Sequence, residues 1–489
     1  MDLTIPGRVP NWIGGSGRPA ADAGWFEKRS PVTGKVLWQV ARSRQADVEA
    51  AVTEAAKTQP AWAAMPAVQR GRILFAVAQA LREHREVLAR AVATESGKSM
   101  REALGEVDGA IDQGMFMGGE GQRLYGRTTT SGVANRSAMT VRCPVGIAGL
   151  IIAANAPIAN IAWKVFPALI CGNAALLKAA EDTPAIAWMF ARLAESAGLP
   201  AGLLNVIQGF GEEAGAPIVE HASIGVISFT GSSEVGRIIA VNAGRRLAKI
   251  SLELGGKNPF VVCDDADLGE ATRWAIQSAF SNAGQRCASG SRIIVMNGVY
   301  DEFRARLVAA TRALSIGPND SDAFGPVIND EQLQSILGRV HAARLRGASV
   351  AVGGERLTGQ IHRDGYYMAP TILEDVPPDD AMSCEEVFGP VTILYRVASF
   401  AEAVELANRT PYGLTACIHT RSFDRAVEFT KRANVGVAVV NGGTHGSEPH
   451  MPFGGAKGSG NGSREPGTEA LDIYSNLRDV YFHTDPAKA

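Results

Sequence analysis

The chain has 489 residues, of which 46% are hydrophobic and 20% charged, as in an ordinary globular protein of two or three domains. Its formal net charge is -2, and no run of lysine or arginine suggests a surface for nucleic acid or an anionic membrane. We therefore expect a small molecule as the partner, and neither nucleic acid nor a membrane.

The cysteines and histidines bear on compartment and metal binding. The six cysteines lie far apart and form no CxxC pair, as expected where thiols stay reduced. The segment MDLTIPGRVPNWIGG has neither a basic region nor a long apolar core, so we expect no signal peptide or anchor there. The eight histidines show no HExxH or other ligand spacing. We expect a cytoplasmic protein without a metal site.

Residues 47–107 are predicted to be helical. Between residues 47 and 107, apolar side chains return every three or four positions, which predicts helices with one buried face. Residues 125–142 are instead rich in Thr, Ser and Val. They predict a hairpin that protrudes as an arm.

Four short apolar segments follow, at residues 146–155, 174–180, 203–209 and 224–232, each separated from the next by a helical stretch. Strands buried on both faces that alternate with helices form a parallel sheet covered on both sides. The fold class is therefore α/β, with a Rossmann-like, doubly wound cofactor domain over residues 1–125 and 143–254. The alternation restarts after residue 254 and predicts a second α/β domain over residues 255–440.

Polar or small residues follow the predicted strands, where ligands of open α/β sheets bind. They are Asn155, Lys178, Glu181, Gly209, Gly211, Gly215, Gly231 and Ser232. The three glycines from Gly209 to Gly215 form GxGxxxG, one residue longer than the dinucleotide pattern GxGxxG. In a chain with 54 glycines, the alternative is a plain tight turn.

Two side chains further along could react with a substrate. Cys287 lies in NAGQRCASGS, and Glu253, in LELGGK, ends a strand-like run 34 positions earlier. One strand and one helix between them could bring both to one end of a sheet. A cysteine more often only packs in a core, and a glutamate at such a place is most often a solvated loop acid. A glutamate kept from full solvation could instead act as a general base.

Four motifs make the chain resemble the aldehyde dehydrogenase superfamily, in order and in spacing. They are ELGGKNP at 253–259, NAGQRC at 282–287, EEVFGP at 385–390 and PFGGAKGSG at 452–460. The resemblance spans nearly the whole chain, from PVTG at 31–34 and ESGK at 95–98 onward. It implies the oxidation of an aldehyde with a nicotinamide cofactor.

The resemblance implies a nucleophile, an oxyanion donor and a base. Cys287 would attack the aldehyde, because a thiohemiacetal passes hydride to the nicotinamide more readily than a free aldehyde does. Asn155 would donate an N–H to the oxyanion, and Glu253 would activate the water that hydrolyses the thioester. A free thiol has a pKa of about 8.5, so a base or the surroundings must help to form the thiolate.

The resemblance also implies a cofactor site. Lys178 and Glu181 match positions that hold the adenine ribose. Ser232 and the nearby glycines would approach the pyrophosphate, while Glu386 and Phe388 would hold the nicotinamide ribose. A carboxylate at Glu181 repels a 2'-phosphate, so we expect NAD as the cofactor rather than NADP. The alternative is that Glu181 caps a helix or faces solvent.

Three residues bear on the substrate. Ala154 and Ala156 flank Asn155 where many family members have Trp and Phe, which predicts a wider tunnel. Arg286 could pair with a distal carboxylate, although an ion-paired or surface arginine is the ordinary alternative. Together they favour a mid-length semialdehyde or oxo-acid aldehyde, as in bacterial semialdehyde-type members. The alternative is a bulky neutral or aromatic aldehyde.

Residues 126–142 and 471–489 resemble the oligomerisation strands of the family. An exposed strand of that length needs a partner edge, so we expect a homodimer or homotetramer.

Three other classes of function would require different residues. A cysteine hydrolase of thioesters or esters would need a base histidine, and His221 and His341 lie in no recognisable motif. A protein that kept only the fold would require none of the three catalytic side chains. An acyl-CoA-forming enzyme would replace water by a thiol acceptor, and the presence of Glu253 favours water.

Overall fold

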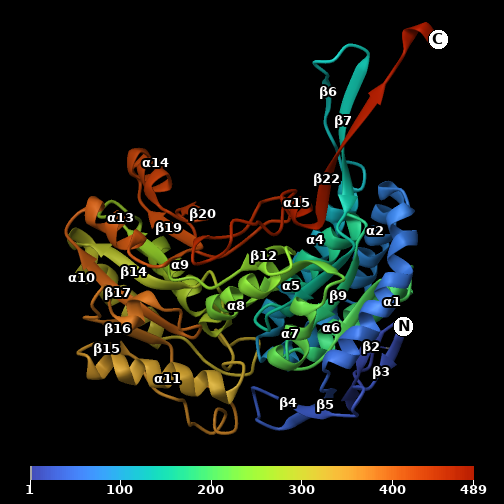
Figure 1. Cartoon of the computed structure of the whole chain (residues 1–489). Coiled ribbons are helices and arrows are strands. Elements are labelled where there is room, and N and C mark those ends of the chain that lie inside the picture. The colour runs from blue at the N-terminus through green and yellow to red at the C-terminus, as the bar shows by residue number, and fades with distance from the viewer. Residues whose placement is uncertain (1–2, 489) are drawn as a thin grey trace.

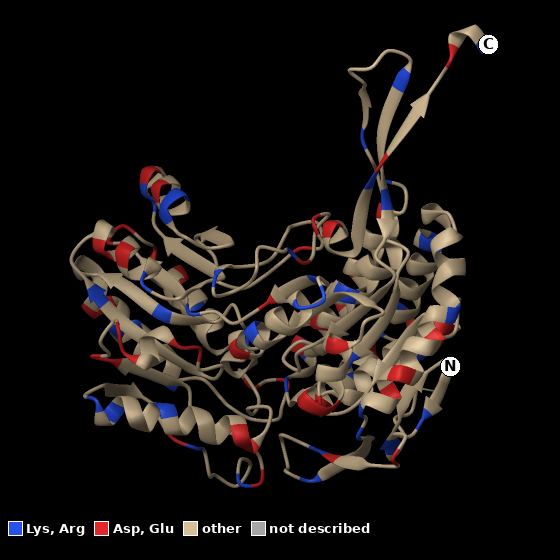
Figure 2. Ribbon diagram, in the orientation of Figure 1, with Lys and Arg blue, Asp and Glu red and all other residues tan. Residues whose placement is uncertain are grey.

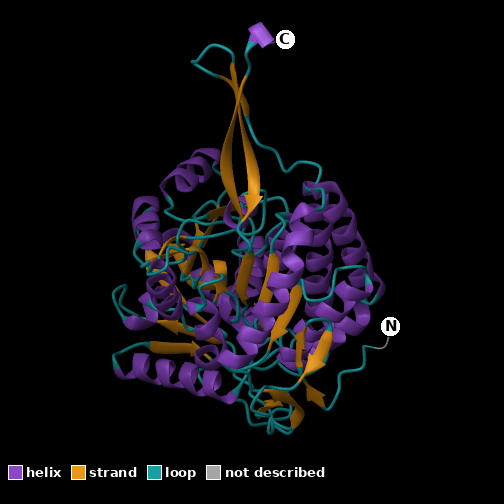
Figure 3. Ribbon diagram, turned by 45° about the vertical axis from the view of Figure 1, so that its right-hand side comes forward, coloured by secondary structure: helices purple, strands orange, loops and turns teal. Residues whose placement is uncertain are grey.

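Two large sheets, each packed against helices, make up most of the protein (Figures 1 and 3). The structure is a computed structural model that describes residues 3–488. The chain builds the first sheet almost completely before it begins the second.

The first sheet has seven strands. In spatial order they are β12 (Lys249–Glu253), β11 (Ile224–Thr230), β8 (Ile147–Ile151), β9 (Ala174–Lys178), β10 (Leu204–Ile207), β2 (Asn11–Ile13) and β3 (Ser16–Arg18). The first five are parallel, and β2 and β3 extend the sheet antiparallel. All residues of β8 and β9 are buried, as in a sheet covered on both faces. The doubly wound sheet predicted from the sequence is confirmed.

Helices from the same part of the chain surround this sheet. They are α1 (Gln45–Ala64), α2 (Ala67–Glu83), α3 (Arg85–Ser96), α4 (Met100–Glu120), α5 (Pro157–Ile170), α6 (Pro184–Ser196), α7 (Ala216–Glu220) and α8 (Ser233–Gly244). A small sheet of β1 (Arg8–Val9), β5 (Val36–Ala41) and β4 (Trp25–Arg29) adjoins them.

The second sheet also has seven strands, which confirms a second α/β unit. They are β15 (Ser349–Val352), β16 (Thr371–Glu374), β17 (Val391–Val397), β14 (Gly290–Met296), β13 (Asn258–Val262), β19 (Thr415–His419) and β20 (Val437–Val440). Only β15 pairs antiparallel within it. Its helices are α9 (Leu268–Phe280), α10 (Asn297–Arg312), α11 (Asp330–Leu345), α12 (Ala381–Cys384), α13 (Phe400–Asn408) and α14 (Phe423–Arg432).

The buried apolar side chains follow the same division. One cluster draws on residues between 3 and 254 and on residues 470–474, and two further clusters lie between 260 and 429. Between β20 and the C-terminal part, the chain crosses from the second sheet to the first near β12 (Figure 1). The short pair β18 (Tyr412–Gly413) and β21 (Ala456–Lys457) lies along this crossing.

A three-stranded antiparallel arm projects from the body (Figures 1 and 3). It consists of β6 (Thr128–Thr130), β7 (Arg136–Pro144) and β22 (Ser475–His483). The expectation of strand from residue 471 was wrong at its start. Residues Ala470–Tyr474 form the helix α15 instead, because four of its five side chains pack into the first core. The short 3₁₀ turn Pro486–Lys488 follows the arm.

Charged side chains of both signs are interspersed around the two sheets (Figure 2). Within residues 3–488, no helix is both long and apolar enough to cross a membrane. The same residues contain no group of three or more His, Cys, Asp or Glu side chains placed to hold a metal ion.

Candidate active site

The predicted site residues of the first sheet lie where its parallel strands end. Glu253 ends β12 and Lys178 ends β9, while Gly231 and Ser232 follow β11. Asn155 follows β8 just before α5. Because these strands are parallel, their carboxyl ends meet at the same edge, where ligands of such sheets bind.

Cys287 is presented by a strained turn after α9. Asn282, Ala283 and Gly284 all have left-handed φ values of 53°, 54° and 66°. Such residues persist only where contacts hold them, and they cluster at functional sites. The Asn282 backbone N–H donates to Glu102 Oε1 (2.7 Å), and the Asn282 side-chain amide donates to the Asn155 backbone carbonyl (3.2 Å). The turn therefore ties Cys287 to Asn155.

The two glycines of ELGGK are required by close approaches. A Cβ at Gly255 would lie 2.4 Å from Glu386 Oε2, and one at Gly256 would lie 2.3 Å from the Cys287 carbonyl oxygen. The Gly256 N–H donates to Glu386 Oε1 at 3.0 Å. Glu386, predicted to bind a ribose, therefore lies against the loop of Gly255 and Gly256, and this loop in turn lies against Cys287.

The Cys287 thiol is half-buried and protonated at neutral pH. Burial, with the charges of Glu386 and Glu253, raises its pKa to about 12, although the Ala288 N–H and Arg286 act in the opposite direction. A thiol with so high a pKa would have to lose its proton in order to act as a nucleophile.

Glu253 is a buried carboxyl group without a partner. It is 5% exposed, and neither oxygen has a hydrogen bond to any residue from 3 to 488. Burial, and then the charge of Glu465, raise its pKa well above the ordinary value. A carboxyl group with a raised pKa holds a proton more strongly than an ordinary glutamate, as a general base must.

Asn155 is positioned by groups that the sequence did not single out. Its backbone carbonyl accepts from Lys98 Nζ (2.8 Å), and Lys98 pairs with Glu106 (2.6 Å). Glu106 in turn accepts from the Ile158 N–H at 2.9 Å, at the start of α5. The Asn155 side-chain amide donates one hydrogen to the Gln285 carbonyl (3.1 Å), which leaves its second hydrogen for an oxyanion.

The predicted adenine-ribose residues form an ion pair. Lys178 Nζ and Glu181 Oε2 are 2.6 Å apart, and the Glu181 side chain is 44% exposed. Burial raises the pKa of Glu181, but Lys178 outweighs it and keeps the pKa below the ordinary value. Glu181 is therefore an ionised acceptor at the edge of the sheet.

The predicted pyrophosphate residues lie at two turns. Ser232 caps α8, since its hydroxyl accepts from the Val235 N–H (3.2 Å), and a Cβ at Gly231 would lie 2.4 Å from the Phe229 ring. Gly211 and Gly215 bound a single turn of π-helix, and neither has an atom closer than 3.9 Å to its Cβ position. Of the three glycines of GxGxxxG, Gly209 has a φ of 122° and lies close to the backbone of Ser43.

Phe388 also has a left-handed φ, of 55°. Gln332 Nε2 donates to its carbonyl at 3.1 Å. Burial raises the pKa of the preceding Glu386 to about 7. The loop of Glu386 and Phe388 is thus held between α11 and the loop of Gly255 and Gly256.

The sequence leaves Arg286 either as a partner of a substrate carboxylate or as part of an ion pair within the protein. Its Nη2 lies 3.6 Å from Glu102 Oε1, so one edge of the guanidinium does form an ion pair. Ala154 and Ala156 are only partly buried beside Asn155. An aromatic pair that the sequence did not reveal lies nearby, with the rings of Trp163 and Phe453 centred 5.5 Å apart. Phe453 precedes Gly454, whose Cβ position is 3.0 Å from Glu253 Oε1.

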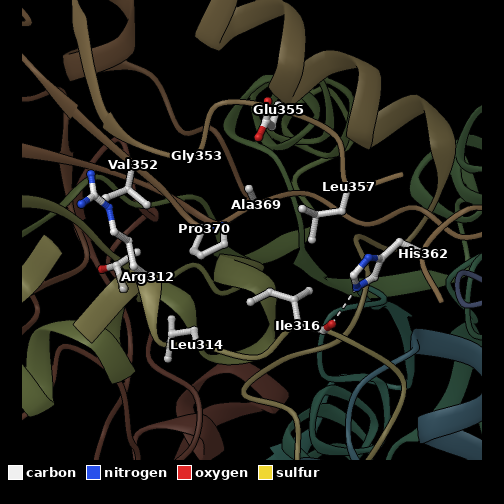
Figure 4. Close-up of a pocket in the computed structure, with 11 residues that line it drawn as sticks. Arg312, Leu314, Ile316, Val352, Gly353, Glu355, Leu357, His362, Ala369 and Pro370 are labelled. Atoms are coloured by element: carbon white, nitrogen blue, oxygen red, sulfur yellow. Dashed lines mark hydrogen bonds between the residues drawn. The ribbon is translucent and has the colours of Figure 1, made fainter. Parts of the chain in front are cut away.

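A separate pocket of about 330 Å³ lies between the end of α10 and the β15–β16 edge (Figure 4). His362 points across it and donates to the Ile316 carbonyl at 2.7 Å. None of the predicted site residues lines this pocket.

Comparisons with known proteins agree with this geometry. The model of the Aldehyde dehydrogenase family matches residues 19–480. An alpha-ketoglutaric semialdehyde dehydrogenase of Bacillus subtilis is 36% identical over 91% of this chain and 92% of its own length. A Haloferax volcanii alpha-ketoglutarate semialdehyde dehydrogenase is 38% identical over 90% and 91% of the two chains.

Solved structures give the same result. Betaine aldehyde dehydrogenase from Staphylococcus aureus in complex with NAD+ superposes with a TM-score of 0.96 at 31% identity, covering 99% of this chain and 96% of that one. An aldehyde dehydrogenase from Bacillus cereus gives 0.94 at 32% identity, covering 97% and 96%. The chain therefore belongs to the aldehyde dehydrogenase family.

Proposed function

We propose that the protein oxidises an aldehyde to the carboxylic acid with NAD, with Cys287 as nucleophile and Glu253 as general base. One observation carries the proposal: a buried carboxyl group without a partner in residues 3–488 lies close enough to the half-buried Cys287 thiol to raise the pKa of that thiol. A core built for stability alone would pair or exclude such a carboxyl group.

The residues divide the reaction between them. Cys287 Sγ bonds to the carbonyl carbon and loses its proton, and the free hydrogen of the Asn155 amide meets the oxyanion, a contact generally worth about 10²- to 10³-fold in rate. NAD, when bound, accepts the hydride that leaves the former carbonyl carbon. Glu253 then takes a proton from water as its oxygen attacks the thioester, and passes this proton to the Cys287 sulfur as the C–S bond breaks.

The residues at the sheet edge suit a dinucleotide. The N-terminus of α8 behind Gly231 and Ser232 offers unpaired N–H groups to a phosphate. Gly211 and Gly215 bound a turn with open space above them. Lys178 and Glu181 would hold the adenine ribose, and Glu386 and Phe388 the nicotinamide ribose. In this proposal residues 1–125 and 143–254 bind NAD, and residues 255–440 supply the nucleophile.

For the substrate, we propose a mid-length semialdehyde or oxo-acid aldehyde. The names of the Bacillus subtilis and Haloferax volcanii relatives support this class, as does the cation at Arg286. A bulky neutral aldehyde is the second candidate, because Ala154 and Ala156 leave space on both sides of Asn155.

The arm supports a homo-oligomer, a homodimer or homotetramer. Leu477, Tyr481 and Phe482 of β22 are more than half exposed, at 63%, 52% and 51%, and apolar strand side chains of this kind seek a partner. All six cysteines are free thiols, which suits the cytoplasm.

The test is NADH formation with purified protein over matched aliphatic, aromatic and ω-carboxylated aldehydes. Turnover that is highest with the carboxylated members is the expected result. No NADH from any aldehyde would refute the proposed oxidation, and a maximum with neutral aromatic aldehydes would favour the second candidate.

A further inference from the structure

A hydrogen bond joins the two α/β units beside the proposed cofactor residues. Asp182 directly follows Glu181, after β9 of the first sheet, and Asn329 directly precedes α11 of the second unit. Asn329 Nδ2 donates to Asp182 Oδ2 at 2.8 Å. The bond therefore crosses from the unit of the adenine-ribose residues to the unit of the nicotinamide-ribose residues.

Asp182 is also fixed from within the first unit. Its Oδ1 lies 3.5 Å from Nζ of Lys28, a residue of β4 whose side chain is only 2% exposed. An ammonium group buried so deeply requires a counter-charge. Because Lys28 and Asn329 contact different oxygens, Lys28 would still hold Asp182 if the contact with Asn329 were lost.

Asn329 uses both ends of its side-chain amide. Its Oδ1 accepts from the Gln332 backbone N–H at 2.8 Å and so caps α11, while its Nδ2 reaches Asp182. The Gln332 side chain donates through Nε2 to the carbonyls of Val387 (3.0 Å) and Phe388 (3.1 Å). The first turn of α11 therefore connects Asp182 with the loop of Phe388.

The residue before this cap contacts the catalytic turn. The Ile328 N–H donates to Gln285 Oε1 at 2.8 Å. The Gln285 carbonyl accepts in turn from the Asn155 side-chain amide at 3.1 Å. A displacement of the start of α11 would therefore move the turn that presents Cys287 as well as the loop of Phe388.

We propose that the bond between Asp182 and Asn329 sets the spacing between the adenine-ribose and nicotinamide-ribose sites, and that both are positioning residues for the cofactor. This inference rests on the proposed NAD-dependent oxidation. A dinucleotide contacts both units at once, so its affinity includes the cost of holding them at the spacing that it requires. A bond that holds this spacing beforehand removes part of that cost. A mononucleotide in the adenine half alone would not depend on it.

The test compares the dissociation constants of NAD and AMP, measured by calorimetry on the full-length protein. Asn329→Ser keeps a hydroxyl oxygen that can cap α11 but removes the amide donor that reaches Asp182. We expect it to weaken NAD roughly tenfold, as for the loss of a hydrogen bond to a charged group, and AMP by less than about twofold, because Lys28 still holds Asp182. Asn319→Ser is the matched control, since Asn319 is an exposed asparagine of the same unit.

An exchange of the two side chains tests the bond itself. Asn329→Asp alone sets two carboxylates against each other and should weaken NAD more than Asn329→Ser does. Asp182→Asn combined with Asn329→Asp moves the donor to the first unit and the acceptor to the second, keeps the total charge, and retains a good N-cap. This double variant should restore NAD affinity to within about threefold of the native value.

Equal weakening of NAD and AMP by Asn329→Ser would overturn the proposal, because the residue would then act on the adenine half alone. Unchanged NAD affinity in Asn329→Ser, or no recovery in the double variant, would also overturn it. In each case, NADH formation by the native protein would leave the proposed oxidation standing. A native protein that neither binds NAD nor reduces it with any aldehyde would instead overturn the proposed function.

Discussion

Two buried carboxyl groups near the end of the first sheet differ in their hydrogen-bond partners. Glu465 is fully paired, and its oxygens accept hydrogen bonds of 2.6 to 3.2 Å from Lys164, Ser228, Ser251 and Tyr474. Glu253 ends the strand that carries Ser251, yet it has no partner within residues 3–488. The two lie close enough for the charge of Glu465 to raise the pKa of Glu253.

The difference separates a structural carboxylate from a chemical one. Lys164 on α5, Ser228 on β11 and Tyr474 on α15 are brought together by Glu465, so it joins three elements of the first core. Glu253 makes no side-chain hydrogen bond to another element within residues 3–488, and its buried surroundings disfavour its ionised form. Removal of the first should therefore damage folding, whereas removal of the second should damage catalysis.

The largest effect is expected at the thiol beside Glu253. Cys287→Ser should lower aldehyde oxidation by at least about 10³-fold, because a hydroxyl is a far poorer nucleophile at neutral pH. NAD affinity, measured by fluorescence titration, should change little. Substantial turnover in this variant would show that the unpaired carboxyl group serves another nucleophile.

Glu465→Gln addresses the structural side of the comparison. It leaves the buried Lys164 ammonium without its counter-charge, which should lower the free energy of unfolding in urea by about 3–5 kcal/mol. Tyr474→Phe, which removes one hydrogen bond and no charge, should cost only about 1 kcal/mol. Glu253→Gln should leave stability unchanged or raise it. Equal losses for Glu465→Gln and Glu253→Gln would abolish the distinction.

A third carboxylate, Glu181, is intermediate, with one partner and partial exposure. The native protein should prefer NAD over NADP by at least about tenfold in kcat/KM, or roughly 1.4 kcal/mol. Glu181→Ser should remove this preference, since it ends the repulsion and frees Lys178 for the phosphate. The exposed Glu220→Ser is the control. Equal use of both cofactors by the native protein would mean that Glu181 points away from the ribose.

The smallest effect concerns the charge around Glu253. Glu253 acts as a base only in its ionised form. Therefore kcat should rise as the pH passes through the pKa of Glu253, which lies well above that of an ordinary glutamate. Arg464 lowers this pKa, so Arg464→Gln should move the acid limb to higher pH by roughly a few tenths of a unit. The exposed Arg363→Gln should not move it. A shift to lower pH after Arg464→Gln would show that another group controls the limb.

The sequence predicted the elements whose signals are local. Continuous apolar runs identified the parallel strands, and Asn155 was correctly placed after one of them. The expectation that Glu253 and Cys287 lie at one end of a single sheet was wrong, because Glu253 ends β12 of the first sheet and Cys287 precedes β14 of the second.

The sequence could not reveal partners that lie far away in the sequence, such as Glu106, which holds Asn155 through Lys98, or Glu465 near Glu253, because these contacts depend on how the elements pack. Strand was predicted at residues 471–474, where burial against the first core produced a helix.

The account depends most on Glu253, and pre-steady-state NADH formation by Glu253→Gln tests it most directly. If Glu253 activates the water, the variant should still form the thioester. It should release a burst of NADH about equal to the active sites and then turn over slowly, at roughly 10⁻² of the native rate or less. A slow first turnover without a burst would contradict this role and assign Glu253 to the earlier removal of the Cys287 proton.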